Sequence, residues 1–258
     1  MIRKLATTVA ILLVSSVAVA ADINVAANTA NVPFEFQDAS GKLVGFEIDL
    51  LNTIGKRLNK SIEFTEMPFN SLFAAVQSGR ADIAIGSITI TPKRLESVSF
   101  TQPFFDANQC LTVGKASGIK GVEGLAGKQV AVVTGTTGEM WATQNDAKYK
   151  FGGISRYDDN VSPMLDIATG RIGGLVHDCP IDAYYIKDKP QYAIVATIPT
   201  NEQFGLMLRK GSPLLRDVDT AIARLKQDGE LARLYTKWFG SSAPTGSSTV
   251  TVTQSPQP

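Results

Sequence analysis

One arginine of the sequence lies where a helix ordinarily avoids positive charge. Thr91 is a typical helix N-cap, and Pro92 suits the first helical position. Lys93 and Arg94 then fall in the first turn, where they oppose the helix dipole. A residue that opposes the local helix preference indicates a functional constraint. The planar guanidinium of an arginine can bind a carboxylate through two parallel hydrogen bonds. The alternative is a surface arginine whose charged end reaches solvent.

A carboxylate follows a short apolar run later in the chain. Leu175 and Val176 are typical of a buried strand, and Asp178 comes where that strand would end. A carboxylate there can pair with an ammonium group, because either charge is costly to bury alone. The alternative is that Asp178 forms a turn ahead of Pro180. His177, the one histidine of the chain, either contacts the same ligand or has a structural role.

The loop Gly135-Thr136-Thr137-Gly138 joins an expected strand to an expected helix. Free backbone N–H groups at a helix start favour an anion. A dinucleotide loop is excluded, because G-x-G-x-x-G is absent and no acidic residue ends a following strand. The motifs HExxH, CxxC and GxSxG are also absent from the sequence. We therefore expect no cofactor, no metal site and no catalytic residue.

Strands and helices must alternate to position these residues. Strands are expected at 22–27, 61–67, 81–85, 110–113, 129–133, 172–176, 193–197 and 206–209. Helices are expected at 45–58, 69–78, 138–144, 162–169, 181–187, 213–226 and 231–238. The alternation indicates an α/β fold with parallel sheets covered on both faces. In such sheets ligands lie beyond the carboxyl ends of the strands.

The two ends of the chain differ from the part between them. Residues 1–20 have a basic start, an apolar stretch and a small-residue cleavage pattern, which are typical of a secretory signal peptide. Residues 241–258 carry no charge and are rich in Ser, Thr, Pro and Gln, so we expect a disordered tail. A short edge strand at 249–252 is the alternative. The remaining residues suffice for two domains.

Charge argues against some classes of partner. The chain has 25 basic and 24 acidic residues, and loss of Arg3 and Lys4 with a signal peptide leaves it close to neutral. Without basic runs there is no electrostatic reason to bind nucleic acid or an anionic membrane.

Several segments together resemble family 3 of the bacterial extracellular solute-binding proteins, the amino-acid receptors of ATP-driven importers. The segments are VPFEF (32–36), GFEIDLLNTIGKRL (45–58), ADIAIGSITITPKR (81–94), LAGKQVAVVTGTTGE (125–139), LVHD (175–178), FGLMLRKGSPL (204–214) and LYTKWFG (234–240). They follow the family's order and span nearly all of 22–240. Within the family, the chain is most similar to the glutamine receptors.

The resemblance implies the two-lobed periplasmic binding protein fold of type II, in which each lobe is a sheet flanked by helices. The two crossings are expected near 104–108 and 202–205. Lobe 1 would then comprise 21–105 and 207–240, and lobe 2 would comprise 106–206.

The resemblance also gives roles to residues of the site. Arg94 is expected to bind the ligand's α-carboxylate, and Asp178 its α-ammonium. Contacts beside Arg94 or from the facing lobe are expected from Gly86, Ser87, Thr89, Thr136 and Thr137.

The side-chain end of the expected pocket departs from the family. Asn28 stands where receptors for glutamine and cationic amino acids often have Asp, and Asn31 stands where an aromatic residue is usual. Phe69 retains the remaining aromatic wall, with a core position as the alternative. An asparagine amide cannot neutralise a buried cation. We therefore expect a neutral polar ligand such as glutamine, rather than arginine or lysine.

Export would permit a disulfide, and Cys110 with Cys179 is the one possible pair. In the family's fold the strand that enters lobe 2 lies antiparallel to the strand that carries Asp178, which brings the two cysteines close. Two buried thiols are the alternative.

The resemblance further implies a monomer in the periplasm that delivers its ligand to an inner-membrane ABC permease. Some exported relatives with this fold are dehydratases, and Glu139 or Glu202 could supply an acid in the cleft. No paired carboxylates and no nucleophile–base set are visible in the sequence, so we expect a receptor rather than an enzyme.

Overall fold

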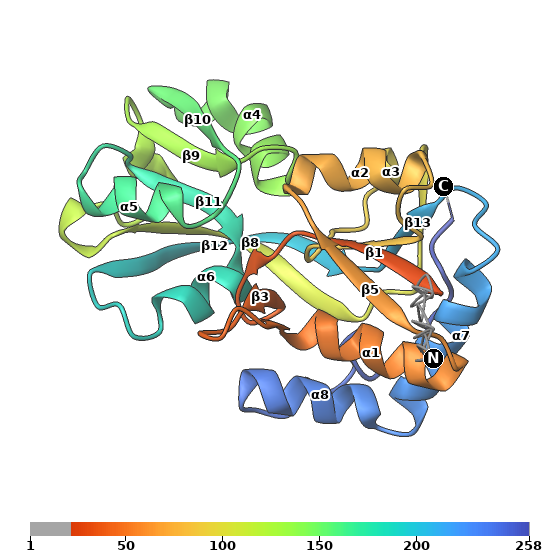
Figure 1. The fold of residues 1–258 in the computed structure, drawn as a ribbon. Coiled ribbons are helices and arrows are strands. Elements are labelled where there is room, and N and C mark those ends of the chain that lie inside the picture. Colours follow the sequence, from red (N-terminus) through yellow and green to blue (C-terminus); the bar gives the residue numbers. More distant parts are fainter. Residues whose placement is uncertain (1–21, 258) are drawn as a thin grey trace, which may run out of the picture.

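The structure is a computed structural model, and it describes residues 22–257 (Figure 1). The expected signal peptide at 1–20 lies outside the described residues. Two five-stranded sheets, each flanked by helices, form two lobes that are joined by two long strands. The predicted α/β fold of the type II binding proteins is confirmed. Within the described part, no helix is long and apolar enough to cross a membrane.

Lobe 1 holds the sheet with strand order β5-β1-β6-β13-β7 and a small sheet of β2, β3 and β4. Its strands are β1 (Ile23–Ala27), β2 (Ala30–Asn31), β3 (Glu35–Gln37), β4 (Leu43–Val44), β5 (Ile62–Glu66), β6 (Ile83–Ile85), β7 (Val98–Phe100) and β13 (Met207–Arg209). Its helices are α1 (Phe46–Leu58), α2 (Phe69–Gln77), α3 (Pro92–Leu95), α7 (Leu215–Gln227) and α8 (Glu230–Phe239).

Lobe 2 holds the sheet with strand order β10-β9-β11-β8-β12. Its strands are β8 (Phe105–Gly114), β9 (Gln129–Val133), β10 (Gly153–Tyr157), β11 (Gly174–Asp178) and β12 (Tyr192–Phe204). Its helices are α4 (Thr137–Tyr149), α5 (Ser162–Ala168) and α6 (Cys179–Ile186), with two short 3₁₀ turns at Lys115–Ser117 and Val122–Leu125.

Both sheets are mixed, so the expectation of parallel sheets is wrong in part. β13 runs antiparallel to β6 and β7, and β8 runs antiparallel to β11 and β12. The chain enters lobe 2 along β8 and returns along β12, and two neighbouring strands that leave and return in this way must be antiparallel.

The strands bury both of their faces. In β1, Val25 and Ala27 pack in the cluster formed with α1, α7 and α8, whereas Ala26 packs in the cluster formed with α2. In β9, Val130 packs with α4 and Ala131 with α5. Because successive side chains point to opposite faces, a continuous apolar run is what such a doubly covered strand requires.

Two helix boundaries in lobe 1 follow from local chemistry. Thr91 caps α3, where its Oγ1 accepts a hydrogen bond from Arg94 N at 3.2 Å. Gly45 precedes α1 with φ of 138°, and a Cβ there would lie 2.1 Å from Phe34 O. Only glycine allows this close approach, which fixes where α1 begins beside β3.

The two strands that join the lobes are anchored in aromatic packing. Phe105 at the start of β8 pairs with Phe204 at the end of β12, and their rings stack with centroids 5.8 Å apart. Both rings also contact Phe34 of lobe 1. The two crossings therefore leave lobe 1 from a buried cluster of aromatic rings.

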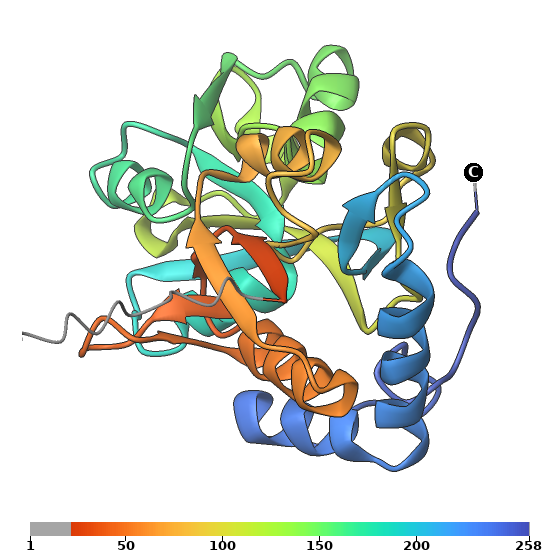
Figure 2. The same cartoon turned by 45° about the vertical axis from the view of Figure 1, so that its right-hand side comes forward.

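In the C-terminal segment, residues 247–251 pack against lobe 1 and the base of β8 and β12, so the expectation of a disordered tail is wrong for this part (Figure 2). Ser248 N donates to Asp106 Oδ2 at 2.8 Å, and Thr249 Oγ1 donates to Phe104 O at 3.0 Å. Lys226 Nζ of α7 donates to Thr251 O at 2.9 Å. The alternative strand at 249–252 is not formed either. Composition failed here because hydrogen bonds, rather than apolar burial, hold the segment.

Candidate ligand-binding site

A pocket lies between the two lobes, and all eleven residues expected at the site line it. The lining residues are Asn28, Asn31, Phe69, Gly86, Ser87, Thr89, Arg94, Val133, Thr136, Thr137, Asp159, Asn160, His177 and Asp178. The enclosed space measures about 20 Å³, which is room for roughly one water molecule. A larger ligand therefore enters only after the lobes separate.

Arg94 projects from α3 into this pocket and is 5% exposed. Its Nη1 donates to Thr89 O at 2.6 Å, and its Nη2 donates to Gly135 O of lobe 2 at 3.0 Å. The guanidinium carbon lies 5.5 Å from the ring centre of Phe69 and 5.2 Å from that of Phe73. A guanidinium has five N–H donors, so these two bonds leave donors for a carboxylate. The alternative of a solvent-exposed arginine is wrong.

Asp178 faces Arg94 from the carboxyl end of β11. Its Oδ1 accepts a hydrogen bond from Gln109 Nε2 at 2.7 Å, and its side chain makes no capping bond to α6. Burial raises the pKa of Asp178 to about 7, although the charge of His177 opposes this shift. Burial likewise lowers the pKa of Arg94 to about 10, while Asp178 and Glu202 raise it. Arg94 therefore stays charged at neutral pH, and a ligand ammonium would favour ionised Asp178.

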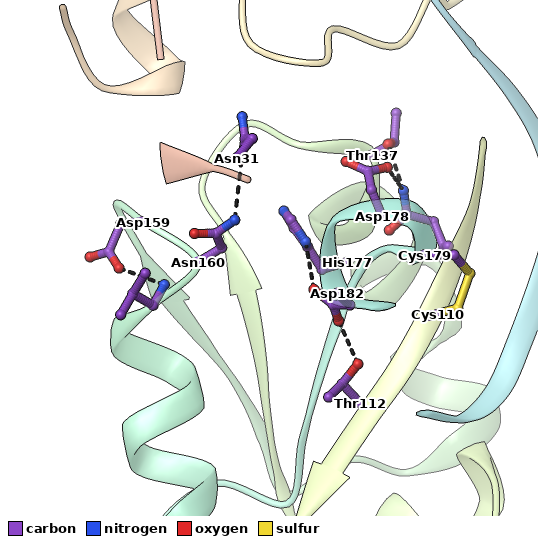
Figure 3. A network of polar contacts seen from close by, with 12 residues as sticks. Asn31, Cys110, Thr112, Thr137, Asp159, Asn160, His177, Asp178, Cys179 and Asp182 are labelled. Carbon is purple, nitrogen blue, oxygen red and sulfur yellow. Dashed lines mark hydrogen bonds and ion pairs between the residues drawn. A yellow bond between two sulfur atoms is a disulfide. The ribbon is translucent and has the colours of Figure 1, made fainter. Parts of the chain in front are cut away.

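His177 is held by a buried carboxylate below the pocket. Its Nδ1 lies 2.9 Å from Asp182 Oδ1, and Asp182 also accepts a hydrogen bond from Thr112 Oγ1 (Figure 3). Burial by itself lowers the pKa of His177, but the bond to Asp182 and the charges of Asp178 and Glu202 outweigh it and raise this pKa. The contact with Asp182 fixes the orientation of the imidazole ring. His177 therefore has a structural role and also lines the pocket.

The loop after β6 shapes the wall next to Arg94. Gly86 has φ of 158° and Ser87 has φ of 51°. The Glu47 carboxylate on α1 accepts hydrogen bonds from Gly86 N at 3.2 Å and Ser87 N at 3.1 Å. These bonds hold Ser87 in a backbone conformation that a side-chain-bearing residue rarely adopts, which is a frequent feature of binding sites.

The N-terminus of α4 forms the facing wall on lobe 2. Thr136 is the N-cap, and its Oγ1 accepts from Glu139 N at 3.3 Å. A Cβ on Gly138 would lie 2.6 Å from Val176 O, so only glycine lets α4 start this close to β11. Thr137 Oγ1 donates to Glu202 Oε2 at 2.8 Å. The start of α4 therefore lines the pocket with Thr136 and Thr137, and free backbone N–H groups at a helix start suit an anion.

Val133, Asp159 and Asn160 line the pocket although the sequence analysis did not select them. Asp159 and Asn160 follow β10, a strand that was not expected, so the rule for the carboxyl ends of strands was not applied there. Asp159 is half-buried, and its oxygens accept from Val161 N, Ser162 N and Ser162 Oγ.

Cys110 and Cys179 are joined by a disulfide, with their Cα atoms 4.9 Å apart (Figure 3). β8 and β11 are antiparallel, and Cys110 pairs with His177 in this register. Cys179, two residues farther, begins α6 beside Cys110. The bond therefore ties the strand that enters lobe 2 to the turn that carries Asp178.

Comparisons with known proteins agree with this architecture. The sequence profile of the bacterial extracellular solute-binding proteins, family 3, matches residues 23–241. A probable histidine-binding protein of Neisseria gonorrhoeae is 32% identical over 83% of this chain and 82% of its own length. A putative ABC transporter arginine-binding protein of Escherichia coli is 30% identical over 87% of this chain and 93% of its own.

Solved structures give the same result. An ancestral arginine-binding protein bound to glutamine superposes with a TM-score of 0.79 and 35% identity, covering 85% of this chain and 98% of that one. An ancestral amino-acid-binding protein described as a precursor of cyclohexadienyl dehydratase superposes with a TM-score of 0.77 and 34% identity, covering 84% and 95%. Neither of the two sequence relatives is described as a glutamine receptor, so that narrower resemblance stays a prediction. The chain belongs to family 3 of the bacterial extracellular solute-binding proteins.

Proposed function

We propose that this protein binds one free amino acid between its lobes, with Arg94 on the α-carboxylate and Asp178 on the α-ammonium. The observation that carries the proposal is that these opposite charges are buried in one pocket and come from different lobes. A zwitterionic ligand satisfies both groups and ties the lobes together, because neither charge is stable when buried without a partner.

The side chain of the ligand is proposed to be neutral and polar, with glutamine as the leading candidate. The far end of the pocket is lined by the amides of Asn28, Asn31 and Asn160. Amides both donate and accept hydrogen bonds, which matches a carboxamide. A related ancestral protein of known structure holds glutamine, which supports this choice.

A cationic amino acid is the second candidate, because the Asp159 carboxylate lines the same pocket and a relative is described as arginine-binding. The Asp159 oxygens already accept hydrogen bonds from Val161 and Ser162 at the start of α5. These hydrogen bonds already stabilise the negative charge of Asp159, so the carboxylate would stabilise a cationic side chain less. This favours the neutral ligand.

A dehydratase is the alternative of a different class, since one structural relative is described as a precursor of such an enzyme. Glu139 accepts from Gly135 N and pairs with Arg156, and it does not line the pocket. Glu202 Oε2 accepts from Thr89, Thr137 and Gln109, so its contacts hold the two lobes together. These engaged carboxylates favour a receptor over an acid catalyst.

The family and the expected signal peptide support export to the periplasm, where the protein would act as a monomer. Closure around the ligand would create the form that an inner-membrane ABC permease recognises, as expected of a receptor in this family.

A thermal-shift screen of the twenty standard amino acids tests the proposal. A ligand that binds only the folded state raises the melting temperature, by an amount that grows with its concentration relative to Kd. We expect the largest shift with L-glutamine and a smaller one with L-arginine or L-lysine. No shift with any amino acid would refute amino-acid binding, and a larger shift with L-arginine would favour the cationic ligand.

A further inference from the structure

The side-chain end of the pocket is built from three buried amides. Asn28 follows β1 and Asn31 lies in β2, both on lobe 1, while Asn160 lies between β10 and α5 on lobe 2. An amide has a donor side and an acceptor side. The direction in which each amide points therefore decides what it offers to a ligand.

Glu35 and Asn28 fix the direction of Asn31. Asn31 Nδ2 donates to Glu35 Oε1 at 2.5 Å and to Asn28 Oδ1 at 3.2 Å. A flipped Asn31 would place its own carbonyl oxygen against these two acceptors, so only one orientation is satisfied. Asn31 Oδ1 therefore points towards lobe 2.

Asn160 is left with a free acceptor in consequence. Its Nδ2 donates across the lobes to Asn31 Oδ1 at 3.2 Å (Figure 3), whereas its Oδ1 is buried without a partner among residues 22–257. A buried acceptor in this state is unfavourable, and an N–H group on a ligand relieves it. Glu35 Oε2 is also buried without a partner, but Glu35 does not line the pocket.

From the sequence, Asn28 was expected to contribute to the choice of the ligand's side chain, but both ends of its amide already form hydrogen bonds. Its Oδ1 accepts from Asn31, and its Nδ2 donates to Met67 O at 3.4 Å. Of these three amides, only Asn160 has a buried polar atom without any hydrogen-bond partner among the described residues.

We propose that Asn160 determines the side-chain specificity: its Oδ1 accepts a hydrogen bond from an N–H of the ligand's side-chain carboxamide. The inference rests on the proposed amino-acid binding by Arg94 and Asp178. The side-chain carboxylate of glutamate has no N–H group to donate to Asn160 Oδ1. It would place its own acceptor oxygen against this acceptor, so glutamine is selected over glutamate. Because Asn160 stands on lobe 2, the selection acts as the lobes close.

The test is calorimetric titration of the exported protein and its variants with L-glutamine and L-glutamate, which have nearly the same shape. We expect the unmodified protein to prefer glutamine by at least ~100-fold, and Asn160→Leu to reduce that ratio by at least ~10-fold. Asn160→Asp keeps the acceptor but loses the donor to Asn31 Oδ1, so it should weaken both ligands and still favour glutamine over glutamate. Asn52→Leu, on the exposed face of α1, is the matched control and should leave the ratio unchanged.

The outcomes separate a specificity role from a structural one. If Asn160 only joins the lobes through Asn31, Asn160→Leu weakens both ligands alike, and an equal loss or an unchanged ratio overturns the proposal. Binding of L-arginine but not L-glutamine by the unmodified protein also overturns it. Failure of the unmodified protein to bind any amino acid contradicts the proposed function itself, and the inference falls with it.

Discussion

Arg94 is held by carbonyl oxygens of both lobes, Thr89 O and Gly135 O, yet it keeps unused donors that face the pocket. We predict that Arg94→Ala lowers amino-acid affinity by at least ~30-fold, because removing a buried charged partner of the ligand costs roughly 2–5 kcal/mol. Calorimetry measures the affinity, and circular dichroism checks that the fold is retained.

Lys93→Ala is the matched control for that variant. Lys93 lies in the same turn as Arg94, but its side chain is 78% exposed and pairs with Glu96 at the surface. Exposed pairs contribute little, so this variant should bind like the unmodified protein. Equal affinities for Arg94→Ala and Lys93→Ala would refute the role of Arg94.

Two buried acids of lobe 1 predict how the stability of the protein varies with pH. Burial raises the pKa of Glu47 to about 7, and it also raises the pKa of Glu35. Groups with raised pKa values stabilise the fold below their unfolded values near 4, and this contribution is lost as pH rises through about 7. The ligand-free protein should therefore melt roughly 5 °C higher at pH 5.5 than at pH 7.5.

Differential scanning calorimetry across this pH range checks the prediction. Glu47→Gln removes one of the titrating groups, so the melting temperature of this variant should vary less with pH than that of the unmodified protein. A melting temperature that increases from pH 5.5 to pH 7.5 would show that the buried acids are ionised at little cost, contrary to this account.

At the residue scale, the charged residues of the pocket could be predicted from the sequence, and its amides only in part. Arg94 stood out because its charge opposes a helix dipole, and Asp178 because it ends an apolar strand. Asn160 carries no such signal, since an Asn in a loop is ordinary and its importance depends on the hydrogen bonds of Asn31 and Glu35. Hydrogen-bond direction in a buried network is a tertiary property that a sequence does not reveal.

Among the elements, the C-terminal segment has the clearest consequence for stability. Burial lowers the pKa of Lys226 to about 8, and its amine is held by Gln102 Oε1, Pro103 O and Thr251 O. Deleting residues 242–258 removes three hydrogen bonds: Thr251 O from this amine, Thr249 Oγ1 from Phe104 O and Ser248 N from Asp106 Oδ2. We predict a loss of about 3 kcal/mol in the free energy of unfolding, at roughly 1 kcal/mol for each buried hydrogen bond, measured by urea denaturation.

A shorter deletion provides the control. Removing only residues 254–258 leaves the bonds of Ser248, Thr249 and Thr251 in place, so the urea midpoint should stay close to that of the full chain. If both deletions give the same midpoint, the segment contributes nothing through these bonds.

Element prediction succeeded where the apolar pattern was strong and failed at sheet edges. β9 was expected at its observed bounds, 129–133, because four of its five residues are buried. β7 and β10 were missed. Both are short edge strands, and β10 has no fully buried residue, so its sequence lacks the pattern that a central strand must have. Because β10 was not predicted, Asp159 and Asn160, which follow it, were not predicted as pocket residues either.

At the scale of the whole molecule, the lobes meet through a small number of polar contacts around the pocket. Arg94 reaches Gly135 O, Asn160 reaches Asn31, and Thr89 lies 3.4 Å from Thr137. Without a ligand, these contacts compete with water and with the unpaired charges of the pocket. A ligand that pairs with Arg94 and Asp178 removes this cost, and the closed arrangement then becomes favourable.

Small-angle X-ray scattering of the exported protein with and without saturating L-glutamine tests this capture most directly. The ligand-free protein should be more extended than the closed structure, because the pocket as described admits no amino acid. Glutamine should reduce the radius of gyration and bring the scattering profile to that calculated from the closed structure. Superimposable profiles with and without glutamine would contradict the claim that the two lobes close on this ligand.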